Sequence, residues 1–91
     1  MLGYETFDPN KVEGAMAVKS DLQEWVFDAV EQLGGEASVA EVAKVIWEKH
    51  EADLRGSGDL FYTWQYDMRW AAEWLRKQNR LTLSGRKWAL A

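Results

Sequence analysis

The sequence predicts one small domain that is mainly α-helical and ends in a short β-hairpin. Three segments space their apolar residues so that each lines one face of a helix, and two short alternating runs follow them around a glycine. The chain has 91 residues, of which 47% are hydrophobic, and it contains six tryptophans and no cysteine. A chain of this size and composition can build one modest core by packing alone.

The first helix is expected to begin after Ser20 or Asp21, because either residue is a good N-cap, and to stop at the glycine pair 34–35. Its predicted core face consists of Leu22, Trp25, Val26, Ala29, Val30 and Leu33. Residues 1–19 show no sustained period. We therefore expect an N-terminal arm there, partly ordered by docking on the domain that residues 20–91 form.

The second helix is expected over about residues 39–50. Ser38 followed by Glu41 is a capping-box pattern, in which each side chain accepts a hydrogen bond from the other residue's backbone N–H. The predicted core face of this helix consists of Val39, Val42, Ala43, Ile46 and Trp47. The next segment, residues 51–58, is polar and ends in an Arg-Gly-Ser-Gly run, which predicts a loop.

A third helix, the longest, is expected to run from a cap at Asp59 to about Gln78. Its predicted core face consists of Phe61, Trp64, Met68, Ala71, Ala72 and Leu75. Asn79 follows as a residue that tolerates the left-handed conformation and can stop a helix.

The alternating runs 81–83 and 87–90 flank the turn residues 84–86 and predict a short β-hairpin. Its expected inward residues are Leu81, Leu83, Trp88 and Leu90. Three helices followed by a hairpin is the order of a winged helix-turn-helix domain. In such domains the third helix usually enters the major groove of DNA, and the hairpin, or wing, contacts the backbone.

Charge is divided unequally along the chain. The formal net charge is −4, which by itself argues against nucleic acid, because DNA affinity depends on Lys and Arg that neutralise phosphates. Residues 1–54 carry four lysines and twelve acidic residues, a balance of −8, whereas residues 55–91 carry seven basic and three acidic residues, a balance of +4. Any DNA contact is therefore expected to be local and confined to the third helix and the hairpin.

The sequence contains no signal-peptide pattern and no apolar run long enough to span a membrane. The lack of cysteine also fits a reducing compartment. We therefore expect a cytoplasmic protein without a membrane partner.

Particular residues resemble one known family. Leu33-Gly34-Gly35-Glu36-Ala37-Ser38 lies between the first two helices, and Trp70-Ala71 with Leu75-Arg76-Lys77 lies in the third. Together with a hairpin that ends in Lys87-Trp88-Ala89-Leu90, this pattern resembles the N-terminal winged-helix domain of Mrr-type restriction proteins over about residues 21–90.

The chain departs from that family at two points. Gln78-Asn79 stands where the family tends to have a small residue and a glycine, and these 91 residues contain no nuclease domain. The resemblance thus implies a DNA-binding module without cleavage activity, such as a small regulator or a phage or accessory protein.

The side of the third helix opposite its core face is the candidate DNA-reading surface. It presents Tyr62, Thr63, Tyr66, Arg69, Trp70, Glu73 and Lys77. Arg69 can bind guanine or phosphate, and Thr63 and Tyr66 can reach phosphates or base edges. Gln65, at the margin, can pair with adenine. The alternative is an ordinary solvated helix face.

Three further basic residues are candidates for phosphate contacts. Arg86 and Lys87 belong to the predicted hairpin turn, and Arg55 belongs to the loop expected before the third helix. Three such sites beside one helix favour a shared surface, although each alone is explained equally well as ordinary loop charge.

Trp70 and Trp74 fall outside the principal core face. We expect the hairpin or the arm to cover Trp70, whereas Trp74 is a candidate for a protein interface, where tryptophans often dominate binding energy. The second hypothesis is accordingly a protein-protein adaptor or inhibitor on a winged-helix scaffold, which the negative charge and many aromatic residues support. A homodimer would suit DNA binding, because one small module makes few base contacts.

The sequence supplies few groups for catalysis or metal binding. His50 is the single histidine, and it is expected near a helix end among solvated charges, where the helix dipole accounts for it. Ser57 lies between two glycines but lacks the preceding strand of a nucleophile loop. We therefore expect neither an enzyme nor a bound metal or cofactor.

Overall fold

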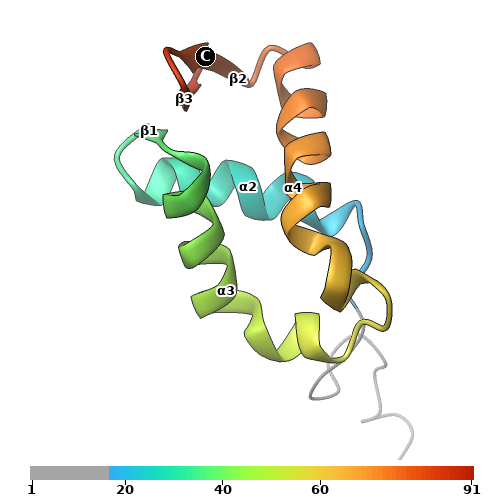
Figure 1. Cartoon of the computed structure of the whole chain (residues 1–91). Coiled ribbons are helices and arrows are strands. Elements are labelled where there is room, and N and C mark those ends of the chain that lie inside the picture. The colour runs from blue at the N-terminus through green and yellow to red at the C-terminus, as the bar shows by residue number, and fades with distance from the viewer. Residues whose placement is uncertain (1–16) are drawn as a thin grey trace, which may run out of the picture.

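The computed structural model describes residues 17–91, so most of the predicted arm lies outside the described residues. Within that range the elements are α2 (Asp21–Gln32), β1 (Glu36–Ala37), α3 (Val39–Arg55), α4 (Leu60–Lys77), β2 (Leu81–Ser84) and β3 (Lys87–Leu90). In Figure 1, α3 and α4 stand on either side of the molecule, α2 crosses behind them, and the hairpin lies at the end where α4 finishes. This arrangement confirms the predicted fold class, a mainly α winged helix-turn-helix domain.

Side chains cap only one of these three helix starts. The Oγ of Ser38 accepts a hydrogen bond from the Glu41 N–H at 3.1 Å, and the Oε1 of Glu41 accepts one from the Ser38 N–H at 2.9 Å. The capping box predicted for α3 is thus confirmed. Ser20 and Asp59 occupy the N-cap positions of α2 and α4 without a side-chain cap.

Left-handed residues follow α2 and α4, as predicted. Gly34 and Gly35 have φ values of +97° and +98°, and Asn79 has a φ of +62°. The N–H of Gly35 donates to the carbonyl of Val30 at 2.9 Å, so the glycine pair also satisfies a carbonyl at the end of α2.

Helix α3 continues to Arg55, so the prediction of a loop over residues 51–58 is wrong for its first five residues. The helix bends at His50, where φ is −128° and ψ is 20°, and then resumes. Leu54 explains the continuation, because its fully buried side chain anchors this turn in the core. An ion pair one turn apart adds to it, with the Nε of Arg55 2.7 Å from the Oε2 of Glu51.

The hairpin acquires a third strand, β1, that was not predicted. The strand order is β1-β3-β2, and all pairings are antiparallel. Glu36 pairs with Ala89 and Ala37 pairs with Trp88. Strand β1 directly precedes the cap of α3, so it attaches the start of that helix to the wing.

The core lies between the three helices and the inner face of the sheet. Its largest fully buried side chains are Leu22, Val26, Val30, Val42, Ile46, Leu54, Met68 and Leu75. Seven of these eight belong to the core faces predicted from apolar spacing, whereas Val45, Leu54 and Leu60 are buried residues that the spacing did not identify. No helix of residues 17–91 is both long and apolar enough to cross a bilayer.

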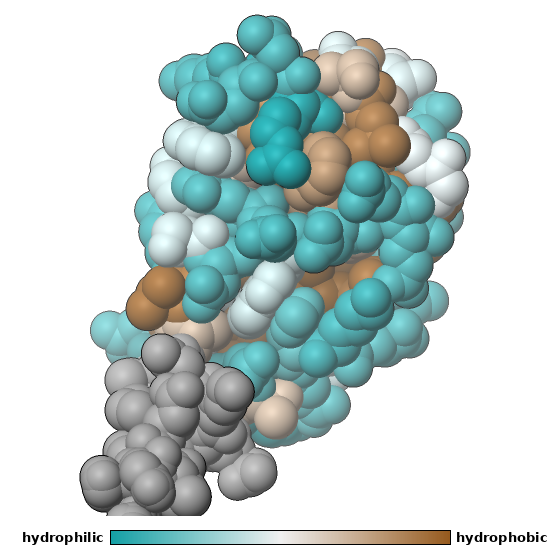
Figure 2. All heavy atoms as spheres, turned by 180° about the vertical axis from the view of Figure 1, so that it is seen from behind, coloured by the Kyte–Doolittle hydropathy of each residue, from teal (hydrophilic) through white to brown (hydrophobic). Residues whose placement is uncertain are grey.

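The wing is only half covered by the core. Leu81 and Trp88 are 2% and 6% exposed, as predicted, but Leu83 and Leu90 are 49% and 38% exposed, so their predicted burial is wrong. Cross-strand pairing places all four residues on one face of the hairpin. Because the hairpin lies at one end of the helices, they cover only part of that face (Figure 1). Viewed from behind, apolar surface gathers mainly at this end of the molecule (Figure 2).

Candidate nucleic-acid interface

The outer face of α4 is exposed along its whole length. All seven residues predicted on that side are accessible to solvent, and Tyr62 and Tyr66 are the most open of them among the large apolar side chains, at 82% and 77%. The opposite face holds Trp64 and Met68, which are 4% and 2% exposed. Helix α4 is thus attached to the domain by one side and presents the other.

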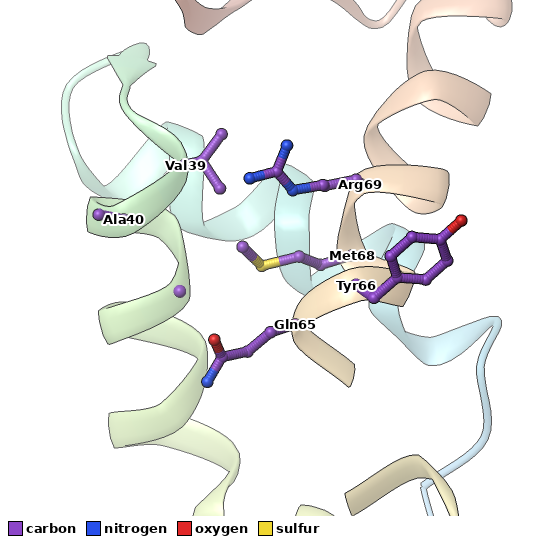
Figure 3. A pocket seen from close by; sticks show the side chains of 7 residues that line it. Val39, Ala40, Gln65, Tyr66, Met68 and Arg69 are labelled. Atoms are coloured by element: carbon purple, nitrogen blue, oxygen red, sulfur yellow. The ribbon is translucent and has the colours of Figure 1, made fainter. Parts of the chain in front are cut away.

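A groove separates α3 from α4 on the exposed side of the molecule. One hollow in it encloses about 500 Å³ and is lined by Val39, Ala40, Ala43, Gln65, Tyr66, Met68 and Arg69. Figure 3 shows Arg69 and Gln65 reaching from α4 toward α3, whereas the ring of Tyr66 points away from α3. Apart from Tyr66, the remaining lining residues have apolar side chains, so the guanidinium and the amide are the groups that can form specific hydrogen bonds there.

A second hollow of about 320 Å³ extends the groove toward the start of α4. Trp47, Phe61, Trp64 and Gln65 line it, so Gln65 borders both hollows. The guanidinium carbon of Arg55 lies 5.2 Å from the centre of the Trp47 ring and 5.8 Å from that of Phe61. Arg55 is therefore held over two aromatic rings and paired with Glu51, at the far end of α4 from the wing.

Carboxylates on the outer face of α4 are already engaged. Asp67 accepts a hydrogen bond from the Thr63 hydroxyl at 2.8 Å, and Glu73 pairs with Arg76 at 2.7 Å. Arg69 and Lys77, by contrast, have no carboxylate within ion-pair distance among residues 17–91. The hydroxyl does not neutralise Asp67, so among the described residues the unpaired charges along this part of α4 are those of Arg69 and Lys77 and the single negative charge of Asp67.

The wing brings another positive charge to the start of α3. The backbone and side-chain hydrogen bonds from Ser38 lower the pKa of Glu41, and the nearby charges of Lys87 and Lys44 lower it further. Both lysines and Arg86 are exposed. The first turn of α3 therefore lies between the wing and the groove that Arg69 enters.

These positions divide the predicted site residues into two groups. Gln65, Tyr66 and Arg69 share one hollow of the groove, and Lys87 lies near its α3 wall. Arg55 lies near the start of α4, whereas the hairpin follows its end. The helix rises about 27 Å over its 18 residues and so separates the two. Arg55 thus lies at the opposite end of α4 from the hairpin turn, with which it was expected to share a surface.

His50 is placed differently from its prediction. It lies at the bend within α3 rather than at a helix end, and its imidazole stacks on the indole of Trp25, with ring centroids 3.8 Å apart and planes 4° from parallel. Burial lowers the pKa of His50, and Lys49 lowers it further, although Asp53 and Asp28 act in the opposite direction. Apolar spacing contains no signal for this contact between two helices.

The two tryptophans outside the core are partly open. Trp70 and Trp74 are 39% and 36% exposed, and the ammonium of Lys19 lies 4.5 Å from the ring centre of Trp70. Ala17 is buried, so the last residues of the predicted arm do contact the domain. Their cover for Trp70 is incomplete.

A comparison with known protein families, with curated proteins and with solved structures finds no match to this chain.

Proposed function

We propose that this chain is a DNA-binding protein in which α4 enters the major groove and the hairpin contacts the phosphate backbone. One observation carries the proposal. Arg69 extends from the exposed face of α4 into the groove beside Gln65, and no carboxylate in residues 17–91 neutralises it.

The chemistry of these side chains suits base reading. Arginine binds the two acceptors of guanine and glutamine binds adenine, each through a pair of hydrogen bonds. Thr63 and Tyr66 can add contacts to phosphates, although the Thr63 hydroxyl already donates to Asp67. Arg69 and Gln65 are thus the residues on which discrimination between bases depends.

The wing supplies the part of the DNA affinity that does not depend on sequence. Arg86 and Lys87 are exposed and unpaired within residues 17–91, so they can neutralise phosphates. Arg55 contributes less, because Glu51 already holds its guanidinium. Base contacts from α4 and phosphate contacts from the wing fit the resemblance to Mrr-type winged-helix domains. We therefore propose a small cytoplasmic regulator or a phage or accessory protein.

The test is the affinity for a mixed-sequence duplex of about two helical turns, measured by fluorescence anisotropy across about 50 to 200 mM salt. Arg69→Ala is expected to weaken binding about tenfold, the order of one good base contact. Arg76→Ala is the matched control, because Arg76 lies on the same helix but is paired with Glu73, and it is expected to change affinity less than about twofold. Absence of duplex binding even at low salt would overturn the proposal.

Contact with a second copy or another protein is the second candidate, and the exposure of Trp70 and Trp74 favours it. Trp74→Ala would then reduce self-association or partner binding. Sedimentation of the wild-type chain and this variant tests the homodimer directly, since two monomeric species would exclude it.

A further inference from the structure

Tyr62 and Tyr66 form a pair of open aromatic rings on the outer face of α4. They are four residues apart, so they lie on adjacent turns with a rise of about 6 Å between them. Phe61 packs its ring against that of Tyr62 at 5.0 Å and 78°, which holds the first ring in place. Two rings that are 82% and 77% exposed have no partner within residues 17–91 that covers them.

A perfect duplex offers few contacts to such rings. Its bases are stacked on one another, so the major groove presents their edges, and aromatic side chains there reach little beyond a thymine methyl group. An unpaired base, by contrast, can lay its whole face against an aromatic ring, and this stacking requires no particular sequence. The exposure of the tyrosine pair therefore favours nucleic acid with unpaired bases.

One cation without a carboxylate partner among the described residues, Arg69, lies close to the pair. Glu73 is paired with Arg76, whereas Asp67 accepts a hydrogen bond from the neutral Thr63 hydroxyl and keeps its charge. Arg69 lies within one turn of Tyr66 and has no carboxylate partner in residues 17–91. Tyr66 and Arg69 line the same hollow, although their side chains point in opposite directions, so a strand that crosses from the rings into this hollow would have a cation available to its phosphates.

We infer that the preferred ligand is DNA with unpaired bases next to a duplex, with those bases stacked on Tyr62 and Tyr66. This inference rests on the proposed function, because Arg69 and the wing hold the adjoining duplex. It makes the protein selective for a DNA structure more than for a sequence.

The experiment compares two labelled probes of matched sequence, a perfect duplex and the same duplex with a bubble of about six unpaired positions. Anisotropy with the full chain is expected to give at least about tenfold tighter binding to the bubble. The double variant Tyr62→Ala/Tyr66→Ala is expected to bind the two probes with equal affinity, because no ring remains for the unpaired bases. Tyr62→Phe/Tyr66→Phe keeps both rings and is expected to keep the preference.

The outcomes separate this inference from the proposed function. Equal affinity for both probes, or a preference that persists in the double alanine variant, would overturn the inference and leave duplex binding intact. Failure to bind either probe would overturn both. Circular dichroism and the melting temperature of the variants establish that they remain folded, which both surface substitutions should allow.

Discussion

The two faces of α4 contain similar residues in opposite surroundings. Trp64 and Tyr66 are two positions apart, yet the first is 4% exposed and the second 77%. Trp64 packs against Trp47 of α3, with ring centroids 6.1 Å apart, whereas Tyr66 points away from α3. An aromatic residue in this helix can therefore serve the core or the surface, and its position relative to α2 and α3 decides which.

The largest expected effect is the difference in unfolding free energy between variants of these two aromatic residues. Trp64→Ala should lower the free energy of unfolding by about 3–5 kcal/mol, because it removes a buried ring and leaves a cavity. Tyr66→Ala should change it by no more than about 0.5 kcal/mol. Urea unfolding of both variants measures the difference, and equal losses would show that the two faces are not as distinct as their exposure indicates.

A smaller effect is expected at the start of α3, which forms one wall of the groove facing Arg69. Ser38→Ala removes the only side-chain cap among the three helix starts and should cost about 1 kcal/mol of unfolding free energy. Ser20→Ala is the matched control, because Ser20 is at the N-cap of α2 without a side-chain bond and should have little effect. Equal losses in the two variants would contradict the assigned role of the capping box.

The smallest effect concerns His50, at the bend that carries α3 past the groove. Burial lowers its pKa in the folded state below the usual value of 6.5, so the imidazole binds a proton less readily folded than unfolded. The associated stability is fully present above pH 6.5 and is lost as the pH falls through the lower folded pKa.

The melting temperature should accordingly decrease as the pH falls from about 7.5 through the lowered folded pKa of His50. His50→Phe keeps a ring against Trp25 but cannot titrate, so its melting temperature should depend less on pH over this window. This range lies above that in which Glu41 takes up a proton, since the usual value of 4.5 is lowered further in the fold. An identical pH dependence in both proteins would show that His50 does not cause it.

Local sequence patterns were sufficient for most of the fold. Apolar spacing located the three helices, the Ser38 and Glu41 pattern located the start of α3, and Asn79 marked the end of α4. Each of these signals arises within a few residues of the chain, where spacing and capping act. The exposed face of α4 could be predicted from the same periodicity, because it lies opposite the apolar face of the helix.

Features that depend on distant contacts could not be predicted in this way. Strand β1 is only two residues long, too short to show alternation, and it exists because β3 pairs with it. The last turn of α3 depends on the burial of Leu54 within an otherwise polar segment. The opposite orientations of Arg69 and Tyr66 relative to α3 depend on where that helix lies, which no spacing specifies.

We propose that DNA binds the outer face of α4 together with the wing, and chemical shifts during a titration test this proposal. Amide signals of the ¹⁵N-labelled chain are followed as mixed-sequence duplex DNA is added at low salt. We predict that residues 62–69 and 84–87 shift together and saturate at the same DNA concentration. Shifts scattered over the molecule, or none in these two segments, would contradict the claim.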